Sequence, residues 1–391
     1  MQTTDARSRT AAGFDALRRG DAAGARPLLE AAVAESPKDE TAWLGLAVAC
    51  HRLGDRDARL AAVDRVLELN PANLRAILLK GDHFAEAGDD RAATAFYRFA
   101  MKAAPQPQQL PPDLIRDLER ARVVCDRVAA DYEAFLRERL AAAGLGAELK
   151  SARFEQSLDL MLGKRQVYFQ EPRAYFFPGL PQRQFYEREA FAWIPALEAR
   201  TDDIRAELTE VLRDDAAFSP YLERIADRPQ VDSLGLLGNP AWSAFYLWKN
   251  GSPVDDNIAR CPKTMAALEN VPLAQLPNRT PSILFSLLKP GTRIPPHNGL
   301  INTRLICHLP LVVPEGCGFR VGNETRRWRE GEVLIFDDSI EHEAWNDSAQ
   351  TRVILLFDIR RPEMTEAENA LVAAAFEAID AYGGVAVAWD D

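Results

Sequence analysis

Three of the five histidines in this chain fall within a stretch of 46 residues, between His297 and His342. His297 stands in KPGTRIPPHNG, which is expected to be a loop directly after an apolar strand, and His342 stands in LIFDDSIEHEAW, again just past an apolar run. Two imidazoles at the ends of neighbouring strands are a common way to build a mononuclear iron site. The third histidine, His308, lies inside an apolar run, where an ordinary core histidine is the competing interpretation.

An arginine follows the second histidine at a distance that could bring it to the same place. Arg352 opens the run RVILLF, ten residues after His342. An arginine that enters an otherwise apolar strand is expected to be partly buried, and its planar guanidinium then needs an anion. The pattern therefore predicts a carboxylate-bearing ligand beside the histidine pair.

The elements that must position these side chains are short strands bounded by turn signals, with no helices between them. An aromatic strand is predicted at 242–248, and Pro310 within the run 304–313 indicates an edge strand or a bulge. A helix at 365–382 is expected to cover the outside. Such a pattern is typical of a sandwich or barrel. The other predicted strands are 282–288, 318–321, 332–336 and 351–359.

The stretch 282–364 resembles the catalytic domain of the aspartyl/asparaginyl β-hydroxylases, and the resemblance continues more weakly back to about residue 165. It is closest in SLLKPGTRIPPHNG, NTRLICHLPLVVPEGCGFRVGNET and EVLIFDDSIEHEAWND. The resemblance implies a double-stranded β-helix of the jelly-roll or cupin-like type. It also implies an enzyme that uses iron(II), 2-oxoglutarate and molecular oxygen to hydroxylate an Asp or Asn residue of a protein or peptide.

The same resemblance carries the family's functional positions onto this chain. The two iron ligands map to His297 and His342, and the arginine that holds the far carboxylate of 2-oxoglutarate maps to Arg352. These three are the expected catalytic residues.

Four more positions match residues that line the family's pocket. Ser286 and His308 are expected to bind the cosubstrate, and Trp242 and Arg304 are expected to bind the substrate. Arg304 is a reasonable partner for a substrate carboxylate, with a structural ion pair as the competing interpretation.

The chain has no acidic residue where most oxygenases of this kind supply a third iron ligand, two places after the first histidine. That place is Gly299, a feature that the resembled family shares and is thought to fill with water. Two-histidine coordination is expected to hold iron weakly, and a chloride-binding halogenase is an alternative for such a site. Four acidic residues beside the second histidine could contribute to the metal site, but capping or supporting roles are expected for them: Asp337, Asp338, Glu341 and Glu343.

The five cysteines are scattered and form no CxxC pair, which favours a reducing compartment and hence the cytoplasm. The animal relatives carry a disulfide in the loop after the strand that ends at Trp248. Here that loop contains only Cys261, so the bridge cannot form and the order of the loop is an open question.

Charge and hydropathy narrow the range of partners. A formal net charge of −11 argues against nucleic acid, which requires a concentrated basic face. The polar N-terminal residues lack the apolar core of a signal peptide, and no run approaches the roughly 18 apolar residues that a membrane span needs. Neither a nucleic acid nor a membrane is therefore expected as a partner.

The first hundred residues form a repeat. Gly20-Asp21, Gly54-Asp55 and Gly88-Asp89 recur every 34 residues, and a proline follows each glycine by 17 residues. The Gly-Asp pair is expected to end one helix, and the proline to end the next. A period of 34 resembles the tetratricopeptide repeat, whose stacked hairpins commonly hold a peptide on their concave side. A packing or dimerisation platform is the alternative.

These observations predict an α+β multidomain protein, in which an all-α superhelix precedes the β domain. The predicted divisions are repeats over 1–105, a linker and capping helices over 106–160, and the dioxygenase domain over 161–391. The repeats favour a polypeptide substrate, held by the helices. A free amino acid or small molecule, the halogenase above, and a repeat-based adaptor with a silent barrel are the alternatives.

Overall fold

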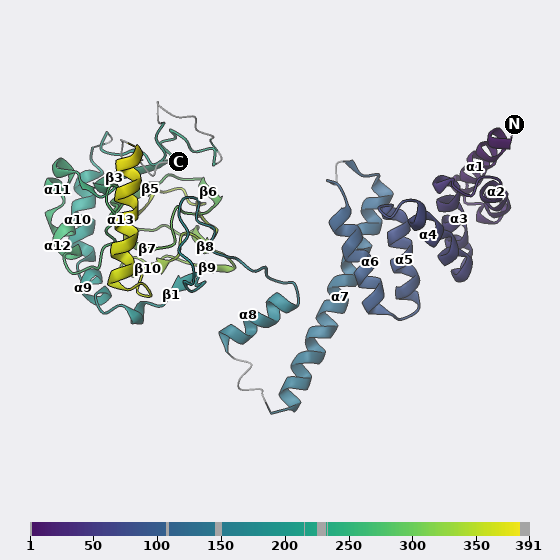
Figure 1. Cartoon of the computed structure of the whole chain (residues 1–391), viewed down its shortest axis with the longest axis horizontal. Helices are drawn as coiled ribbons and strands as arrows, with labels where there is room; N and C mark the ends of the chain where they lie inside the picture. The colour runs from purple at the N-terminus through teal and green to yellow at the C-terminus, as the bar shows by residue number, and fades with distance from the viewer. Residues whose placement is uncertain are drawn as a thin grey trace. The chain divides into compact units, whose positions relative to one another are not determined.

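The computed structural model describes residues 2–106, 109–144, 151–214, 216–224, 232 and 234–383. The chain divides into two compact units, residues 1–164 and 165–391, and each is described by itself (Figure 1). The first consists of helices, and the second contains the β-sheets. None of the described helices is long and apolar enough to cross a membrane.

The N-terminal unit begins with three helix pairs that carry the 34-residue repeat. Gly54 ends one helix with a φ of 75°, and the side chain of Asp55 caps the next by accepting a hydrogen bond from the backbone N–H of Ala58. Asp21 and Asp89 cap their helices in the same way. The predicted repeat is therefore confirmed. The six helices are α1 Gln2–Arg18, α2 Ala22–Glu35, α3 Glu40–Leu53, α4 Arg56–Leu69, α5 Leu74–Glu86 and α6 Asp90–Ala103.

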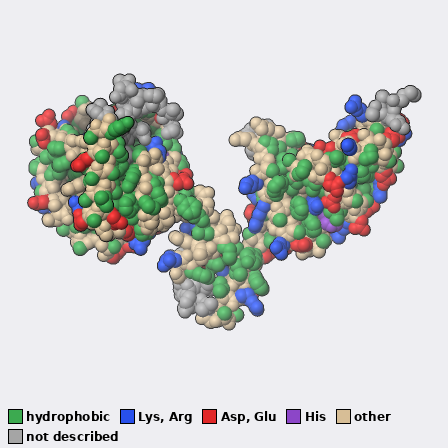
Figure 2. All heavy atoms as spheres, viewed as in Figure 1, with side chains coloured by type: hydrophobic (Ala, Val, Ile, Leu, Met, Phe, Trp, Pro, Cys, Tyr) green, Lys and Arg blue, Asp and Glu red, His purple; other side chains and the backbone are tan. Residues whose placement is uncertain are grey.

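Two further helices belong to the same unit, α7 (Pro112–Ala142) and α8 (Ala152–Met161). Leu114, Ala121 and Cys125 of α7 pack against the last repeat, in a buried cluster with Tyr97 and Ala100. A single long helix thus covers the apolar face that the last hairpin would otherwise expose. Acidic and basic side chains intermingle over the visible face of this unit (Figure 2).

Two antiparallel sheets form the frame of the C-terminal unit. The larger sheet has the order β1-β10-β7-β12-β5-β3-β2, and the smaller has the order β6-β11-β8-β9. From β5 onward the chain alternates between the sheets as in a jelly roll, except for the hairpin β8–β9 within the smaller sheet, and this confirms the predicted fold class. The strands of the larger sheet are β1 Phe185–Tyr186, β2 Ser219–Pro220, β3 Trp242–Lys249, β5 Ile283–Leu288, β7 Arg304–Val312, β10 Leu334–Phe336 and β12 Arg352–Arg360, with β4 Ser252–Pro253 paired to β3. Those of the smaller sheet are β6 Thr292–His297, β8 Cys317–Val321, β9 Glu324–Arg326 and β11 His342–Asn346.

The expectation that His297 lies in a loop was wrong, because it ends strand β6. Pro295 and Pro296 obscured this strand in the sequence. They are tolerated because β6 is an edge strand, paired only with β11. Strand β11 was not predicted either, because its five residues alternate in burial but not in polarity.

Pro310 lies in β7, between β10 and β12, and is therefore not on an edge strand. The pairing with β12 shifts here: Val353 lies opposite Val312, and Ile354 lies opposite Pro310. Of the two predicted possibilities, the bulge is the one observed.

The pleat of the larger sheet sorts its side chains onto two faces. In β7, Leu305, Cys307 and Leu309 belong to the core on the outer face, together with Ile204 and Leu208 of a helix. The even-numbered residues of β5, β7 and β12 point the other way, toward the smaller sheet. The helices beside the outer face are α9 Ile194–Glu198, α10 Thr201–Val211, α11 Asp255–Arg260 and α12 Pro262–Leu268 (Figure 1).

Cys261 joins α11 to α12, and its side chain is buried as a free thiol in the outer core. The loop whose order the sequence left open is thus folded into two short helices without a disulfide. The C-terminal helix α13 (Glu366–Gly383) packs Val372 and Phe376 against Leu276 and Ile301.

Candidate active site

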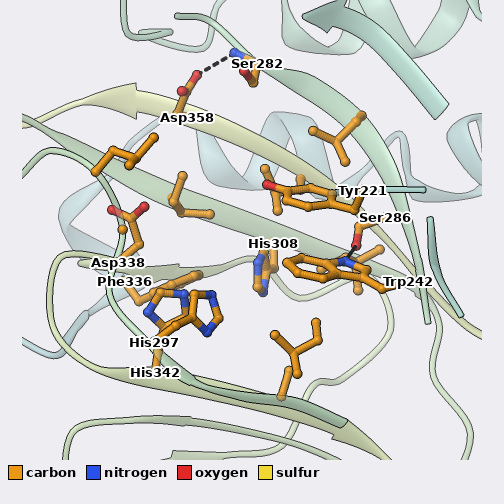
Figure 3. A pocket seen from close by; sticks show the side chains of 18 of the residues that line it. Tyr221, Trp242, Ser282, Ser286, His297, His308, Phe336, Asp338, His342 and Asp358 are labelled. Carbon is orange, nitrogen blue, oxygen red and sulfur yellow. Dashed lines mark hydrogen bonds between the residues drawn. The ribbon is translucent and has the colours of Figure 1, made fainter. Parts of the chain in front are cut away.

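A cavity of about 190 Å³ lies between the two sheets. The larger sheet contributes inward-facing residues of β3, β5, β7 and β12, and the smaller sheet contributes β6, β8 and β11. All seven site residues predicted from the sequence line this cavity: Trp242, Ser286, His297, Arg304, His308, His342 and Arg352. Most of them are labelled in Figure 3.

His297 and His342 lie opposite each other in the pairing of β6 with β11. Their ring centroids are 4.1 Å apart, and Figure 3 shows the two imidazoles side by side. The sheet register thus brings together two side chains that are far apart in sequence. His342 is also flanked by Phe336, at 5.5 Å between ring centroids.

The hydrogen bonds of these rings fix their tautomers. Nδ1 of His297 lies 2.8 Å from the carbonyl oxygen of Pro295, and Nδ1 of His342 lies 3.1 Å from that of Ile340. A carbonyl oxygen only accepts, so each Nδ1 carries the proton and each Nε2 keeps its lone pair. Burial lowers the pKa of His297 to about 3, with a further contribution from His342, and lowers the pKa of His342 to about 4. Both rings are therefore neutral near pH 7, as metal ligands must be.

The carboxylate of Asp338 occupies the space beside Gly299. A Cβ built on Gly299 would lie 2.1 Å from Oδ2 of Asp338, and the backbone N–H of Gly299 donates to the carbonyl oxygen of Asp338 at 2.6 Å. Residue 299 therefore has no room for a side chain. Burial raises the pKa of Asp338, against the opposing effects of Arg304 and His297.

Arg352 is 1% exposed and begins strand β12. Its guanidinium lies over the ring of Trp328, at 4.9 Å from the ring centroid, and Nη1 donates to the carbonyl oxygen of Ser286 at 3.3 Å. No acidic side chain forms an ion pair with Arg352 in the part of the chain that the structure describes, and its buried Nε has no hydrogen-bond partner there. Burial lowers the pKa of Arg352 to about 10. This is an arginine placed to receive an anion.

Ser286 and Trp242 meet at the opposite end of the cavity from Asp338 (Figure 3). The indole N–H of Trp242 donates to Oγ of Ser286 at 3.3 Å. Tyr221 stacks on Trp242 with ring centroids 4.0 Å apart and ring planes inclined by 8°. The stacking sets the plane of the indole against the cavity.

His308 lies on β7 among aromatic rings, with Phe336 at 4.8 Å and Phe319 at 5.1 Å between centroids. The indole N–H of Trp328 lies 3.3 Å from Nδ1 of His308, which therefore accepts. Burial lowers the pKa of His308 well below its ordinary value, with a smaller contribution from the cation of Arg352. A neutral ring whose Nδ1 accepts carries its proton on Nε2 and can donate from there.

Arg304 has different surroundings. Its Nη2 lies 3.1 Å from Oδ2 of Asp338, and its Nε lies 3.6 Å from Oδ2 of Asp358. Burial disfavours its charge, but the two carboxylates outweigh burial and raise the pKa of Arg304. Asp358 is held in turn by the backbone N–H of Ser282, which donates to it at 3.0 Å. Burial raises the pKa of Asp358 to about 6, although Arg304 favours its ionised form.

The donors present suit the groups that the sequence implies. Two neutral imidazoles with free Nε2 atoms fit a divalent transition metal such as iron(II), and the unpaired Arg352 fits a carboxylate of 2-oxoglutarate. Within the described residues, no group of three or more His, Cys, Asp or Glu side chains is placed to hold a metal together.

The cavity residues that the sequence did not predict include Tyr221, Trp328 and Asp358. Asp358 could have been predicted, because it lies six residues after Arg352 in the same predicted strand, and residues an even number of positions apart in a strand face the same side. Tyr221 lies just after the two-residue strand β2, and Trp328 lies in a segment with no regular element, where no periodicity marks a direction.

The two units of the chain match different family models. The family model described as aspartyl/asparaginyl beta-hydroxylase matches residues 198–362, and that of the tetratricopeptide repeat matches residues 16–64. The aspartyl/asparaginyl beta-hydroxylase of Mus musculus is 42% identical over 147 residues, which is 37% of this chain and 19% of the mouse protein. Aspartate beta-hydroxylase domain-containing protein 2 of Homo sapiens is 32% identical over 204 residues, or 51% of this chain and 53% of the human protein.

A bacterial relative has a different printed activity. The ornithine lipid ester-linked acyl 2-hydroxylase of Rhizobium tropici is 34% identical over 180 residues, which is 45% of this chain and 60% of that protein. In each of these three relatives the matched part is less than two thirds of the relative's length. The match to the hydroxylase family model spans His297, His342 and Arg352 of this chain. The C-terminal unit of this chain therefore contains a region, residues 198–362, that is similar to the aspartyl/asparaginyl beta-hydroxylases, and residues 16–64 match the tetratricopeptide repeat.

Proposed function

We propose that this protein is an iron(II)- and 2-oxoglutarate-dependent hydroxylase that adds one oxygen atom to the β-carbon of an Asp or Asn residue in a polypeptide. The observation that carries the proposal is the pairing of two neutral histidines, with their Nε2 atoms free, in one cavity with a buried arginine that has no acidic partner among the described residues. A metal and an anionic cosubstrate are the two ligands that such a site is built to take.

In this proposal His297 and His342 hold the iron, and Arg352 holds the far carboxylate of 2-oxoglutarate. When bound, iron and 2-oxoglutarate together activate oxygen to oxidise an unactivated C–H bond. The backbone carbonyls of Pro295 and Ile340 keep each imidazole in the tautomer that can bind metal.

The rest of the wall positions the cosubstrate and keeps bulk water away from it. Ser286 of β5 supplies a hydroxyl beside Arg352, and His308 of β7 supplies an N–H from the same face of the larger sheet. The aromatic rings of Trp242, Phe319 and Phe336 line the cavity and limit the access of water to the reacting atoms.

Two alternatives from sequence analysis fit the site less well. A halogenase needs room for chloride beside the first histidine, but there the carboxylate of Asp338 fills the space next to Gly299. A second anion would be repelled by that carboxylate. A silent adaptor would have no use for an anion-binding arginine that is buried without an acidic partner, since such a group costs stability.

The printed activity of the Rhizobium tropici relative suggests acyl-chain hydroxylation as a second candidate function. The cavity wall argues against it. Arg304, Asp338 and Asp358 are charged side chains that lie together in that wall, and an alkyl chain would leave Nη1 of Arg304 and Oδ1 of Asp338 buried without a hydrogen bond. A polar side chain on a polypeptide fits better, and the tetratricopeptide repeats are proposed to hold that polypeptide.

The test uses the purified full-length protein with iron(II), ascorbate and 2-oxoglutarate. Conversion of 2-oxoglutarate to succinate should require iron(II), and peptides with a central Asp or Asn should stimulate it and gain the mass of one oxygen atom. His342→Ala serves as the inactive control. Succinate production that is independent of iron(II), or the absence of any hydroxylated peptide from a randomised library, would overturn the proposal.

A further inference from the structure

The cavity wall contains two buried arginines with opposite surroundings. Arg352 pairs with no acidic side chain in the described part of the chain. Arg304, by contrast, lies between two buried carboxylates, at 3.1 Å from Asp338 and 3.6 Å from Asp358. An incoming carboxylate would therefore find an uncommitted cation at Arg352, and at Arg304 a group of one cation and two anions.

The group around Arg304 also holds an unused donor and an unused acceptor. Nη1 of Arg304 and Oδ1 of Asp338 are both buried, and neither has a hydrogen-bond partner among the described residues. The carboxylate of Asp358 accepts a hydrogen bond from the N–H of Ser282, and the carboxylate of Asp338 packs against Gly299, so both are held beside Arg304. Buried polar atoms of this kind are costly unless a ligand completes them.

We infer that this site selects an Asn side chain over an Asp side chain. The oxygen of a carboxamide accepts from Nη1 of Arg304, and its NH2 group donates to Oδ1 of Asp338, so both unused atoms are satisfied at once. A carboxylate satisfies only the arginine, and it faces Asp338 with no proton between the two groups. This inference rests on the proposed function and deepens it, because it names the substrate side chain.

The other basic residues of the cavity do not restore a place for a carboxylate. Arg279 is committed to Asp380, with Nη1 donating to Oδ2 at 2.6 Å and Nη2 donating to Oδ1 at 2.5 Å. Arg173 is exposed, and water and salt screen a cation in that position. Arg304 is therefore the buried cation that we expect to contact the substrate side chain and to determine the choice between Asn and Asp.

The experiment compares two randomised peptide libraries that differ only in a central residue, Asn in one and Asp in the other. The full-length protein is loaded with iron(II), ascorbate and 2-oxoglutarate, and hydroxylated peptides are counted by mass spectrometry. We expect the Asn library to be hydroxylated at least about tenfold more than the Asp library, because a site built around hydrogen-bond donors and acceptors rejects the mismatched isostere strongly. The same libraries retained by the protein without oxygen give the ratio of binding, independent of turnover.

Variants then test the residues that carry the selectivity. Asp338→Asn removes the repelling charge and should lower the ratio of Asn to Asp peptides by about tenfold or more in both assays. Asp358→Asn is the second variant, farther from the histidines, and should lower the ratio in the same direction by releasing Arg304 from one partner. Asp347→Asn is the matched control, since Asp347 is exposed and pairs on the surface with Arg293.

The outcomes separate the two levels of the proposal. An Asn preference that both variants erode and the control keeps supports the inference. Equal hydroxylation of the two libraries, or a preference for Asp, overturns the inference and leaves the proposed function standing. If neither library gains oxygen, the proposed function fails, and the inference that rests on it falls too.

Discussion

His297 and His342 face each other across the β6–β11 pairing, with ring centroids 4.1 Å apart and both Nδ1 atoms donating to backbone carbonyls two residues earlier in the chain. Because the carbonyls belong to the strand and loop that hold the rings, the tautomer is set by the backbone itself. The pair is thus preorganised, and binding a metal requires no change of protonation near neutral pH.

Replacing either histidine should abolish metal binding. His297→Ala and His342→Ala each leave a single imidazole, and in this cavity no other His, Cys, Asp or Glu cluster among the described residues can take over. We expect the bound manganese or iron, measured by elemental analysis after gel filtration, to fall below about a tenth of the wild-type amount, together with 2-oxoglutarate turnover. His51→Ala, in the repeat unit, is the control. A wild-type metal content in either variant would show that the replaced histidine does not bind the metal.

Arg352→Met should distinguish the role of Arg352 in binding 2-oxoglutarate from its effect on the stability of the fold. Without an anion, Arg352 is a buried cation whose pKa is lowered to about 10 by desolvation, so an apolar side chain of similar length should stabilise the protein or leave it unchanged. The KM for 2-oxoglutarate should instead rise by about 30-fold or more, equivalent to roughly 2 kcal/mol. Arg293→Met, on the surface of β6, is the control.

The two measurements for Arg352→Met are denaturant unfolding without 2-oxoglutarate and steady-state kinetics with it. A large loss of stability with an unchanged KM would show that Arg352 serves the fold rather than the cosubstrate.

Gly299→Asp should fail to supply a third metal ligand. The new Cβ would lie 2.1 Å from Oδ2 of Asp338, and its carboxylate would crowd another one. We expect a loss of stability of more than about 1 kcal/mol and no gain in metal affinity. In the double variant Gly299→Asp with Asp338→Gly the space is returned, so stability should recover. Tighter metal binding by the single variant, with undiminished stability, would contradict the packing described here.

Asp358 should leave a signature in the dependence of stability on pH. Its pKa is raised to about 6 in the folded protein, above the ordinary value of 3.8, so the folded state holds this proton more tightly than the unfolded state. The contribution is present below about pH 4 and is lost as the pH rises through 6. Relative to Asp358→Asn, the wild type should therefore lose up to about 3 kcal/mol of unfolding free energy between pH 4 and pH 7. A constant difference across that range would show that Asp358 is not buried as described.

Much of the site could be predicted because strands have a period of two residues. Once 282–288, 304–313 and 351–359 are strands, Ser286, Arg304, His308 and Arg352 need only share a face to meet in one cavity. The repeats were predictable for a related reason. Each Gly-Asp pair combines a left-handed residue with a capping side chain, and these two needs are local.

What the sequence could not predict depends on contacts between segments without periodicity. The approach of Asp338 to Gly299 joins two loops that are distant in sequence, and nothing local in either loop requires it. Tyr221 reaches Trp242 from an irregular segment. Strand β6 was missed because its prolines argue against a strand, and only its position at a sheet edge makes them acceptable.

The alternation of side chains between two faces in β5, β7 and β12 also determines where the domain can tolerate insertions and deletions. Deleting or inserting one residue within any of these strands would exchange the two sets of side chains beyond that point, turning Leu305, Cys307 and Leu309 into the cavity and Arg304 or His308 into the apolar core. Single-residue length changes should therefore be far more damaging there than most substitutions. We therefore expect natural relatives to differ in length in the connections between strands rather than within them.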